Sequence, residues 1–289
     1  MSRKLDDNTR GRIKLIVLRV IVYLILIFLT VLCLFFFYLM IINATRSNAQ
    51  LAAGFTLLPK ENFFRNLVNA WTDTSINIPR GMLNSLIIAL SSAVLTTYFS
   101  ALTAYGIHAY EFRGKRVIFT FIIAIMMIPA QVSALGFVQM MNKLHLTNSY
   151  IPLIVPSIAA PVVFFYMKQY MESVLPLDVI DAARVDGSGE FRTFNTIVLP
   201  MLKPAIAVQM IFSFVSSWNN YFVPALLLDK AEMKTVPIMI AQLRSADYSK
   251  FDMGKVYMFI LLAILPVMIT YILLSKSIIK GVTSGSVKG

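Results

Sequence analysis

Long stretches without a charged residue constrain the fold of this chain more than any other feature. Residues 20–42 contain no charged side chain, and five further stretches of the same kind follow. A helix rises about 1.5 Å per residue and a bilayer core is about 30 Å thick, so roughly 20 such residues cross it. We predict an all-α, polytopic membrane protein with six transmembrane helices, at residues 20–42, 83–109, 117–141, 146–167, 204–228 and 256–275.

The lysines and arginines between these stretches predict the orientation. The tail 1–19, residues 110–116, the loop 168–203 and the tail 276–289 carry sixteen of them, and the alternate segments carry ten. Cytoplasmic flanks hold the excess of basic residues. We therefore expect both termini and the 168–203 loop in the cytoplasm, and the 229–255 loop outside. The net charge of +12 is then a property of membrane topology, and no nucleic-acid partner is expected.

The distribution of acidic, cysteine and histidine residues argues against several functions. All 14 aspartates and glutamates lie outside the six stretches, whereas ion-driven transporters keep ionisable groups inside the bundle. Cys33 is the only cysteine, and His108 and His145 lie far apart, so no metal-ligand spacing is present. We expect no metal site and no catalytic residues. A self-sufficient secondary transporter remains the alternative from a different class.

The stretch 204–228 is the richest in polar and aromatic side chains. Gln209, Ser213, Ser216 and Asn220 follow i, i+4, i+7, i+11 spacing and share one helical face. Neutral amides and hydroxyls pair with sugar hydroxyls, and aromatic faces pack on sugar rings. This face also suits packing against a neighbouring span, so both interpretations stay open. The candidate pathway residues are Gln209, Phe212, Ser213, Ser216, Trp218, Asn219, Asn220 and Tyr221.

The 168–203 loop contains a short predicted helix. Pro176 suits a first helical position, Asp178 suits the first turn, and Gly187 supplies a left-handed stop. About 11 residues give roughly 16 Å, half a membrane thickness, so this helix is expected at the cytoplasmic side. Leu177 and Ile180 share one face of it, which we expect to be exposed and to need a partner.

The same loop carries a family resemblance. Asp181-Ala182-Ala183, Gly187 after three residues, and Ile197-Val198-Leu199-Pro200 after nine more resemble the E-A-A-x3-G-x9-I-x-L-P loop of ABC importer permeases. Aspartate replaces the usual glutamate, which keeps the charge but shortens the reach by one methylene. The segments KSIIKGVTSGSVKG and SWNNYFVPALLL resemble the tail and fifth span of the smaller, six-span maltose-type permease.

The resemblance implies a permease of a bacterial cytoplasmic-membrane importer for a carbohydrate, with an oligosaccharide favoured over another polar solute such as a glycerol phosphodiester. Its implied partners are a second permease subunit, two copies of an ATPase that hold ATP and Mg, and an external solute-binding protein. The chain has no G-x-x-x-x-G-K-[ST] loop, so no cofactor of its own is expected. The implied ATPase-coupling residues are Leu177, Ile180, Asp181, Ala182, Ala183, Arg184, Asp186 and Gly187, and the implied binding-protein contacts are Thr235, Pro237, Gln242 and Leu243.

Overall fold

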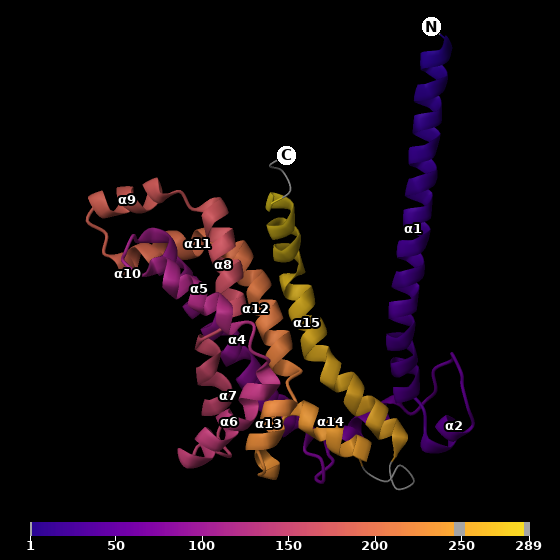
Figure 1. Cartoon of the computed structure of the whole chain (residues 1–289). Helices are drawn as coiled ribbons and strands as arrows, with labels where there is room; N and C mark the ends of the chain where they lie inside the picture. The colour runs from indigo at the N-terminus through magenta and orange to yellow at the C-terminus, as the bar shows by residue number, and fades with distance from the viewer. Residues whose placement is uncertain (1, 246–251, 286–289) are drawn as a thin grey trace. The chain divides into compact units, whose positions relative to one another are not determined.

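The computed structural model describes residues 2–245 and 252–285, and every regular element in them is a helix (Figure 1). They form two compact units. The first contains α1 to α3 and the start of α15, and its boundaries lie after Thr72 and after Leu261. The second begins at Asp73 and takes up α15 again at Leu262. Each unit is described by itself below.

The first unit combines one long apolar helix with a small group of loops that are held together by hydrogen bonds. Side chains are exposed along residues 11–38 of α1. Past its end, the Asn66 amide is fully buried and donates to the carbonyls of Ala44, at 2.9 Å, and Arg46, at 2.8 Å. These bonds satisfy carbonyls that a helix end leaves free. The elements are α1 (Ser2–Ala44), α2 (Asn48–Ala52), α3 (Phe63–Trp71) and α15 (Met253–Gly285) up to Leu261.

The second unit is built around α4 (Ile78–Ala109), which packs along α8 (Pro161–Val174) and α12 (Lys203–Trp218). The Asn77 side chain caps α4 by accepting from the Arg80 amide at 3.1 Å, which satisfies a donor left free at the helix start. Small residues of α4, among them Ala93, Ala101 and Ala104, are fully buried and allow close approach of its neighbours.

Shorter elements complete this unit. They are α5 (Lys115–Ile125), α6 (Ala130–Lys143), α7 (Ile151–Ile154), η1 (Val155–Ile158), α9 (Leu177–Val185), α10 (Glu190–Thr193), η2 (Phe194–Val198), α11 (Leu199–Met201), α13 (Phe222–Leu227), η3 (Ala231–Met233) and α14 (Val236–Ser245). The main apolar cluster lies at the α9 end of α4, where Phe194, Met167 and Met171 are fully buried against Tyr105.

Each of the six predicted stretches is mainly helical, although three of them are divided among shorter helices. Within residues 2–245 and 252–285, four segments are long and apolar enough to cross a membrane: Gly11–Ala44, Ile78–Ala109, Ile151–Val174 and Met253–Leu273. A fifth candidate is the pair Glu190–Met201 and Lys203–Trp218, which is bent by 83°. The predicted span at 117–141 is divided into α5 and α6, because Pro129 lacks an amide donor and disfavours a helical conformation in the residue before it. Six spans therefore stay a prediction.

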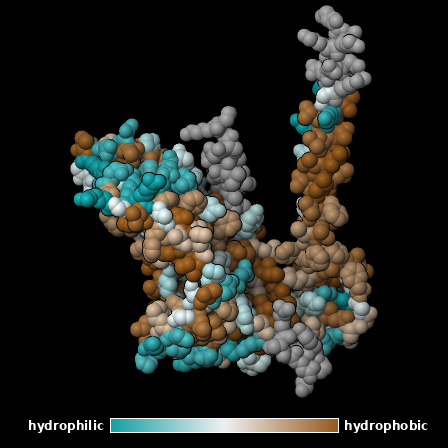
Figure 2. All heavy atoms as spheres, viewed as in Figure 1, coloured by the Kyte–Doolittle hydropathy of each residue, from teal (hydrophilic) through white to brown (hydrophobic). Residues whose placement is uncertain are grey.

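Hydropathy divides the second unit into bands (Figure 2). Hydrophilic side chains gather over α9 at one end and over the opposite end, and hydrophobic side chains dominate between them. This order is typical of a protein that crosses a bilayer, because only the ends meet water.

Candidate functional site

The loop helix α9 ends as its sequence predicts. Pro176 precedes the first helical residue, and Gly187 has the left-handed φ of 76° that glycine adopts without steric cost. The Gly187 amide donates to the Arg184 carbonyl at 3.0 Å, and the Ser188 amide donates to the Ala183 carbonyl at 2.9 Å. These two bonds form a Schellman motif, which fixes the direction of the chain after α9.

The faces of α9 are divided differently from the expectation. Ile180 is fully buried in the chain's own apolar cluster and Ala183 is 5% exposed, so neither is free to be buried against a partner. Ile180 lies inward because α9 rests on the end of α4 and α8, a contact that the sequence alone did not reveal. Asp181, Ala182, Asp186 and Gly187 are exposed, and Leu177 is half-exposed.

Two apolar residues beside this outer face were missed by sequence reasoning. Val185 is 87% exposed and Phe191 is 69% exposed. Val185 lies four residues after Asp181, and helical spacing places these two residues on the same face of α9, a signal that could have identified it. With Leu177, they are the exposed large apolar residues of α9 and α10.

Arg184 ties α9 to its neighbours. Its guanidinium donates to Glu190 Oε1 at 2.7 Å, to Asp181 Oδ1 at 2.9 Å and to the Ala109 carbonyl at 3.4 Å. The same Glu190 carboxylate accepts from the Tyr105 hydroxyl of α4 at 2.6 Å. A chain of charge-assisted hydrogen bonds therefore runs from α9 through Glu190 to α4.

This network keeps Glu190 ionised. Hydrogen bonds from Arg184 and then Tyr105 lower the pKa of Glu190 from 4.5 to about 2, and the bond to Glu190 raises the pKa of Arg184. Because folding lowers the Glu190 pKa, its stabilising effect is present above pH 4.5 and is lost only as the pH falls toward 2. The Glu190 side chain is 40% exposed, so solvent screening reduces that effect.

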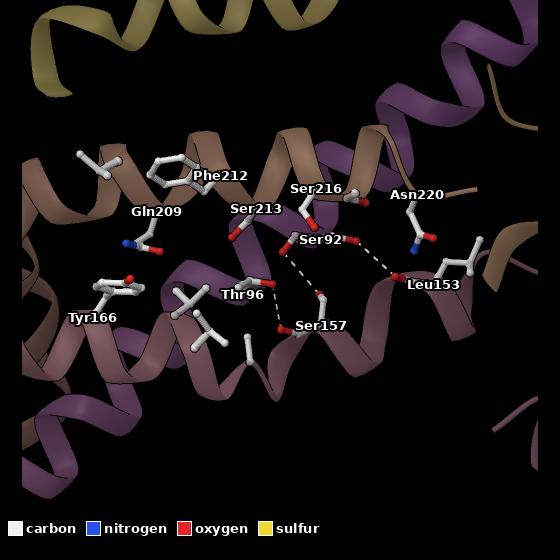
Figure 3. A pocket seen from close by; sticks show the side chains of 15 residues that line it. Ser92, Thr96, Leu153, Ser157, Tyr166, Gln209, Phe212, Ser213, Ser216 and Asn220 are labelled. Atoms are coloured by element: carbon white, nitrogen blue, oxygen red, sulfur yellow. Dashed lines mark hydrogen bonds between the residues drawn. The ribbon is translucent and has the colours of Figure 1, made fainter. Parts of the chain in front are cut away.

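A second candidate site is a cavity of about 790 Å³ between α4, η1, α8 and α12. The predicted polar face of α12 points into it, toward side chains of α4 and η1 (Figure 3). Its lining includes Ser92, Thr96, Ser157, Tyr166, Gln209, Phe212, Ser213, Ser216, Ser217 and Asn220, and no charged side chain.

The hydroxyls on the two sides of the cavity differ in their bonding. On α4, Ser92 donates to the Leu153 carbonyl at 3.3 Å and Thr96 donates to the Ser157 carbonyl at 2.8 Å, so both hold helices together. On α12, Ser213 Oγ is buried and has no hydrogen-bond partner among the described residues. A buried hydroxyl without a partner is costly unless a ligand or water pairs with it.

The other candidate pathway residues lie elsewhere. Trp218 is 3% exposed, stacks on Phe214 and donates to the Ala263 carbonyl at 3.2 Å, so it is a packing residue. Asn219 is exposed in the turn that ends α12 and does not line the cavity. Tyr221 lines a separate hollow of about 340 Å³.

The predicted outer contact loop folds into α14. Thr235 and Leu243 are buried, Pro237 is partly buried and Gln242 is exposed. Gln242 lines the same hollow as Tyr221, so the structure brings together two residues that the sequence assigned to different roles. The remainder of the 229–255 loop, at residues 246–251, lies outside the described residues.

Comparison with known proteins decides the family. Residues 93–278 match the model of the family described as binding-protein-dependent transport system inner membrane component. The chain belongs to this family. As a permease of a binding-protein-dependent ABC importer, it is a membrane-embedded transport subunit that works with an ATPase and a substrate-binding protein.

Curated relatives of this permease cover nearly its whole length. It is 35% identical to the arabinooligosaccharides transport system permease protein AraQ of Bacillus subtilis over 279 residues, which are 94% of this chain and 97% of that protein. It is 28% identical to the trehalose/maltose transport system permease protein MalG of Thermococcus litoralis over 266 residues, 91% of this chain and 94% of that one. The lactose transport system permease protein LacG of Rhizobium radiobacter is also 28% identical, over 93% of this chain and 96% of its own.

A solved structure has the same fold. A chain of a bacterial ABC transporter involved in the import of the acidic polysaccharide alginate superposes with a TM-score of 0.79 at 21% identity. The match covers 90% of this permease and 96% of that chain. The all-α importer permease fold predicted from the sequence is confirmed.

Proposed function

We propose that this permease forms half of the translocation pathway of an ATP-driven importer for a carbohydrate, with an oligosaccharide as solute. The observation that carries the proposal is the uncharged, hydroxyl- and amide-lined cavity on α12, which contains an aromatic residue on each of two helices, Tyr166 and Phe212. Its volume falls within the range of about 300 to 1,000 Å³ that is usual for small-molecule sites. The names of the three relatives described above, which refer to sugar transport, agree with it.

The other subunits of the importer and the orientation of this chain belong to the same proposal. A second permease subunit completes the pathway, two copies of a cytoplasmic ATPase bind ATP and Mg, and this chain has no catalytic activity of its own. Both termini lie in the cytoplasm of a bacterium. The outer face of α9, from Asp181 to Gly187, docks on the ATPase, and α14 with Gln242 contacts the binding protein.

In this mechanism α9 follows the ATPase as it closes on ATP. Ile180 and the Arg184–Glu190–Tyr105 chain connect α9 to the end of α4, whose other residues Ser92 and Thr96 form one wall of the cavity. Movement of α9 is thereby passed to the wall that faces the polar side of α12. The solute, released by the binding protein, exchanges hydrogen bonds with water for hydrogen bonds with the Ser213 hydroxyl and the other polar groups on that side.

Affinity purification from the native membrane in mild detergent tests the assembly. We expect a second permease and an ATPase to co-elute in stoichiometric amounts. If the permease elutes alone in several detergents and with nucleotide added, the proposed assembly is wrong, and a self-sufficient transporter takes its place.

Uptake by the reconstituted importer tests the cavity. With arabinotriose, lactose and maltotriose as probes, Gln209→Ala should lower uptake of the transported sugar up to about tenfold, because one hydrogen bond is worth about 0.5 to 1.5 kcal/mol. Asn219→Ala, which removes a similar amide outside the cavity, is the matched control and should transport normally. Equal uptake by the two variants would contradict the pathway, and uptake of glycerophosphodiesters alone would favour the other solute class.

A further inference from the structure

A second cavity, of about 470 Å³, lies where α4, α5 and α8 meet. Lys115, Arg116 and Lys168 line it, and Glu111 is the only acidic residue in the lining. None of these residues lines the α12 cavity or belongs to the exposed face of α9. Nothing in the transport mechanism described above uses them.

The charges around this cavity do not cancel. Lys115 pairs with Glu111 at 2.6 Å, and the Glu111 side chain is 88% exposed. Lys168 pairs with Glu172. Arg116 has no ion-pair partner in the part of the chain that the structure describes, so a positive charge is left over beside the cavity. The cavity therefore attracts an anion.

Part of the cavity wall is apolar, and one of its basic side chains is held in place. The Lys168 side chain is only 12% exposed, and its ammonium lies 4.8 Å from the centre of the Phe119 ring, which holds it in place by a cation–π contact. Phe112 is 40% exposed and Val117 is 72% exposed. This apolar surface begins where α5 enters the uncharged stretch 117–141, the depth at which lipid headgroups give way to acyl chains.

We propose that this cavity binds the phosphate of an anionic membrane lipid, with Arg116 and Lys168 on the phosphate and the acyl chains along Val117 and Phe119. The proposal rests on the orientation proposed above, which places these residues at the cytoplasmic leaflet. Basic pockets between helices on that side bind anionic headgroups in other membrane proteins. Inorganic phosphate offers the same charge and oxygens but has no acyl chain, so the apolar walls favour the lipid.

Native mass spectrometry of the assembled importer tests the proposal. The complex in detergent is mixed with phosphatidylglycerol or with phosphatidylcholine, and the retained lipid is counted. We expect retention of phosphatidylglycerol over phosphatidylcholine, and at least a fivefold loss of bound phosphatidylglycerol for Arg116→Gln and for Lys168→Gln. Lys143→Gln removes the same charge at the exposed end of α6 and should retain lipid as the unaltered complex does.

Comparison of the variants, and of lipid with inorganic phosphate, distinguishes the possible results. Lys168→Gln also breaks the pair with Glu172, so Arg116→Gln, which breaks no such pair, decides the result if the first variant fails to assemble. Equal retention by Arg116→Gln and Lys143→Gln overturns the proposal. It is also overturned if inorganic phosphate binds in an Arg116-dependent way and phosphatidylglycerol does not. Since lipid retention is read without transport, this failure is distinguishable from a failure of the carbohydrate proposal.

Discussion

Gly187 has the left-handed backbone conformation that turns the 168–203 loop after α9. At its φ of 76°, a side chain costs about 1 to 2 kcal/mol. Gly187→Ala should therefore weaken the turn that closes α9 and lower sugar uptake, although a Cβ atom would meet no neighbour within 4 Å. Hydrogen exchange of the backbone amides at positions 187 and 188 measures directly how often this turn opens.

Gly189, two residues later, provides the control. Its φ is −66°, which any residue adopts, and it too has open space around it. Gly189→Ala should leave exchange and uptake nearly unchanged. Similar exchange in both alanine variants would mean that the left-handed turn does not hold the loop.

Two other glycines allow close helix packing, and they differ in what surrounds them. A Cβ on Gly254 would collide with the Arg46 carbonyl oxygen and lie 2.7 Å from Asn66 Nδ2. These two groups are hydrogen-bonded to each other within the first unit, so neither can easily move. A Cβ on Gly81 would meet the flexible side chain of Met239, 2.6 Å from its Cε. Gly254→Ala should cost about 1 to 3 kcal/mol and Gly81→Ala less, because methionine adapts. Thermal unfolding of the purified complexes shows which variant loses more stability, and equal losses of stability would contradict this prediction.

At the scale of elements, the connection between α9 and α4 joins the helix proposed to dock on the ATPase to the helix that lines the cavity. Tyr105→Phe removes the 2.6 Å hydrogen bond to Glu190 and leaves the ring in the apolar cluster. We expect ATP hydrolysis to continue while the amount of sugar moved per ATP falls about two- to tenfold, as one charge-assisted bond is lost. Parallel assays of hydrolysis and uptake in proteoliposomes measure this ratio.

Tyr170 on α8 is the matched control for that experiment. It packs against the same apolar cluster, and its hydroxyl has no hydrogen bond among the described residues. Tyr170→Phe should therefore keep the normal ratio of sugar to ATP. A normal ratio in Tyr105→Phe as well would show that the remaining contacts, among them Ile180 and the hydrogen bond from Arg184 to the Ala109 carbonyl, are enough to connect the two helices.

At the scale of the whole molecule, the bias of basic residues predicts how the chain crosses the membrane. A green fluorescent protein fused after Gly289 should fluoresce, because that protein folds in the cytoplasm, and a copy inserted in the 229–255 loop should not. A fusion before Met1 should fluoresce too. A fluorescent insertion in the 229–255 loop would reverse the proposed orientation and remove the basis for the lipid site and for ATPase docking by α9.

Much of this protein is determined by the sequence alone, because the governing forces are local or additive. Apolar stretches of sufficient length predict helices in a bilayer, and the resemblance of the 168–203 loop predicted the family that the comparisons established. The four polar residues Gln209, Ser213, Ser216 and Asn220 share a helical face by spacing, and all four line one cavity. The stop of α9 at Gly187 follows from backbone sterics.

Only the tertiary structure decided which faces those helices bury. Sequence spacing places Ile180 on a face expected to meet a partner, whereas the structure buries it in the chain's own apolar cluster. Trp218 is a candidate pathway residue by sequence, and in the structure its buried indole donates to the Ala263 carbonyl. Periodicity gives the angle of a residue around its helix, but not which neighbour lies at that angle. Contacts between Tyr105 and Glu190, or between Arg184 and Ala109, join positions far apart in the chain. They depend on how the helices pack against one another, and local sequence patterns do not contain that information.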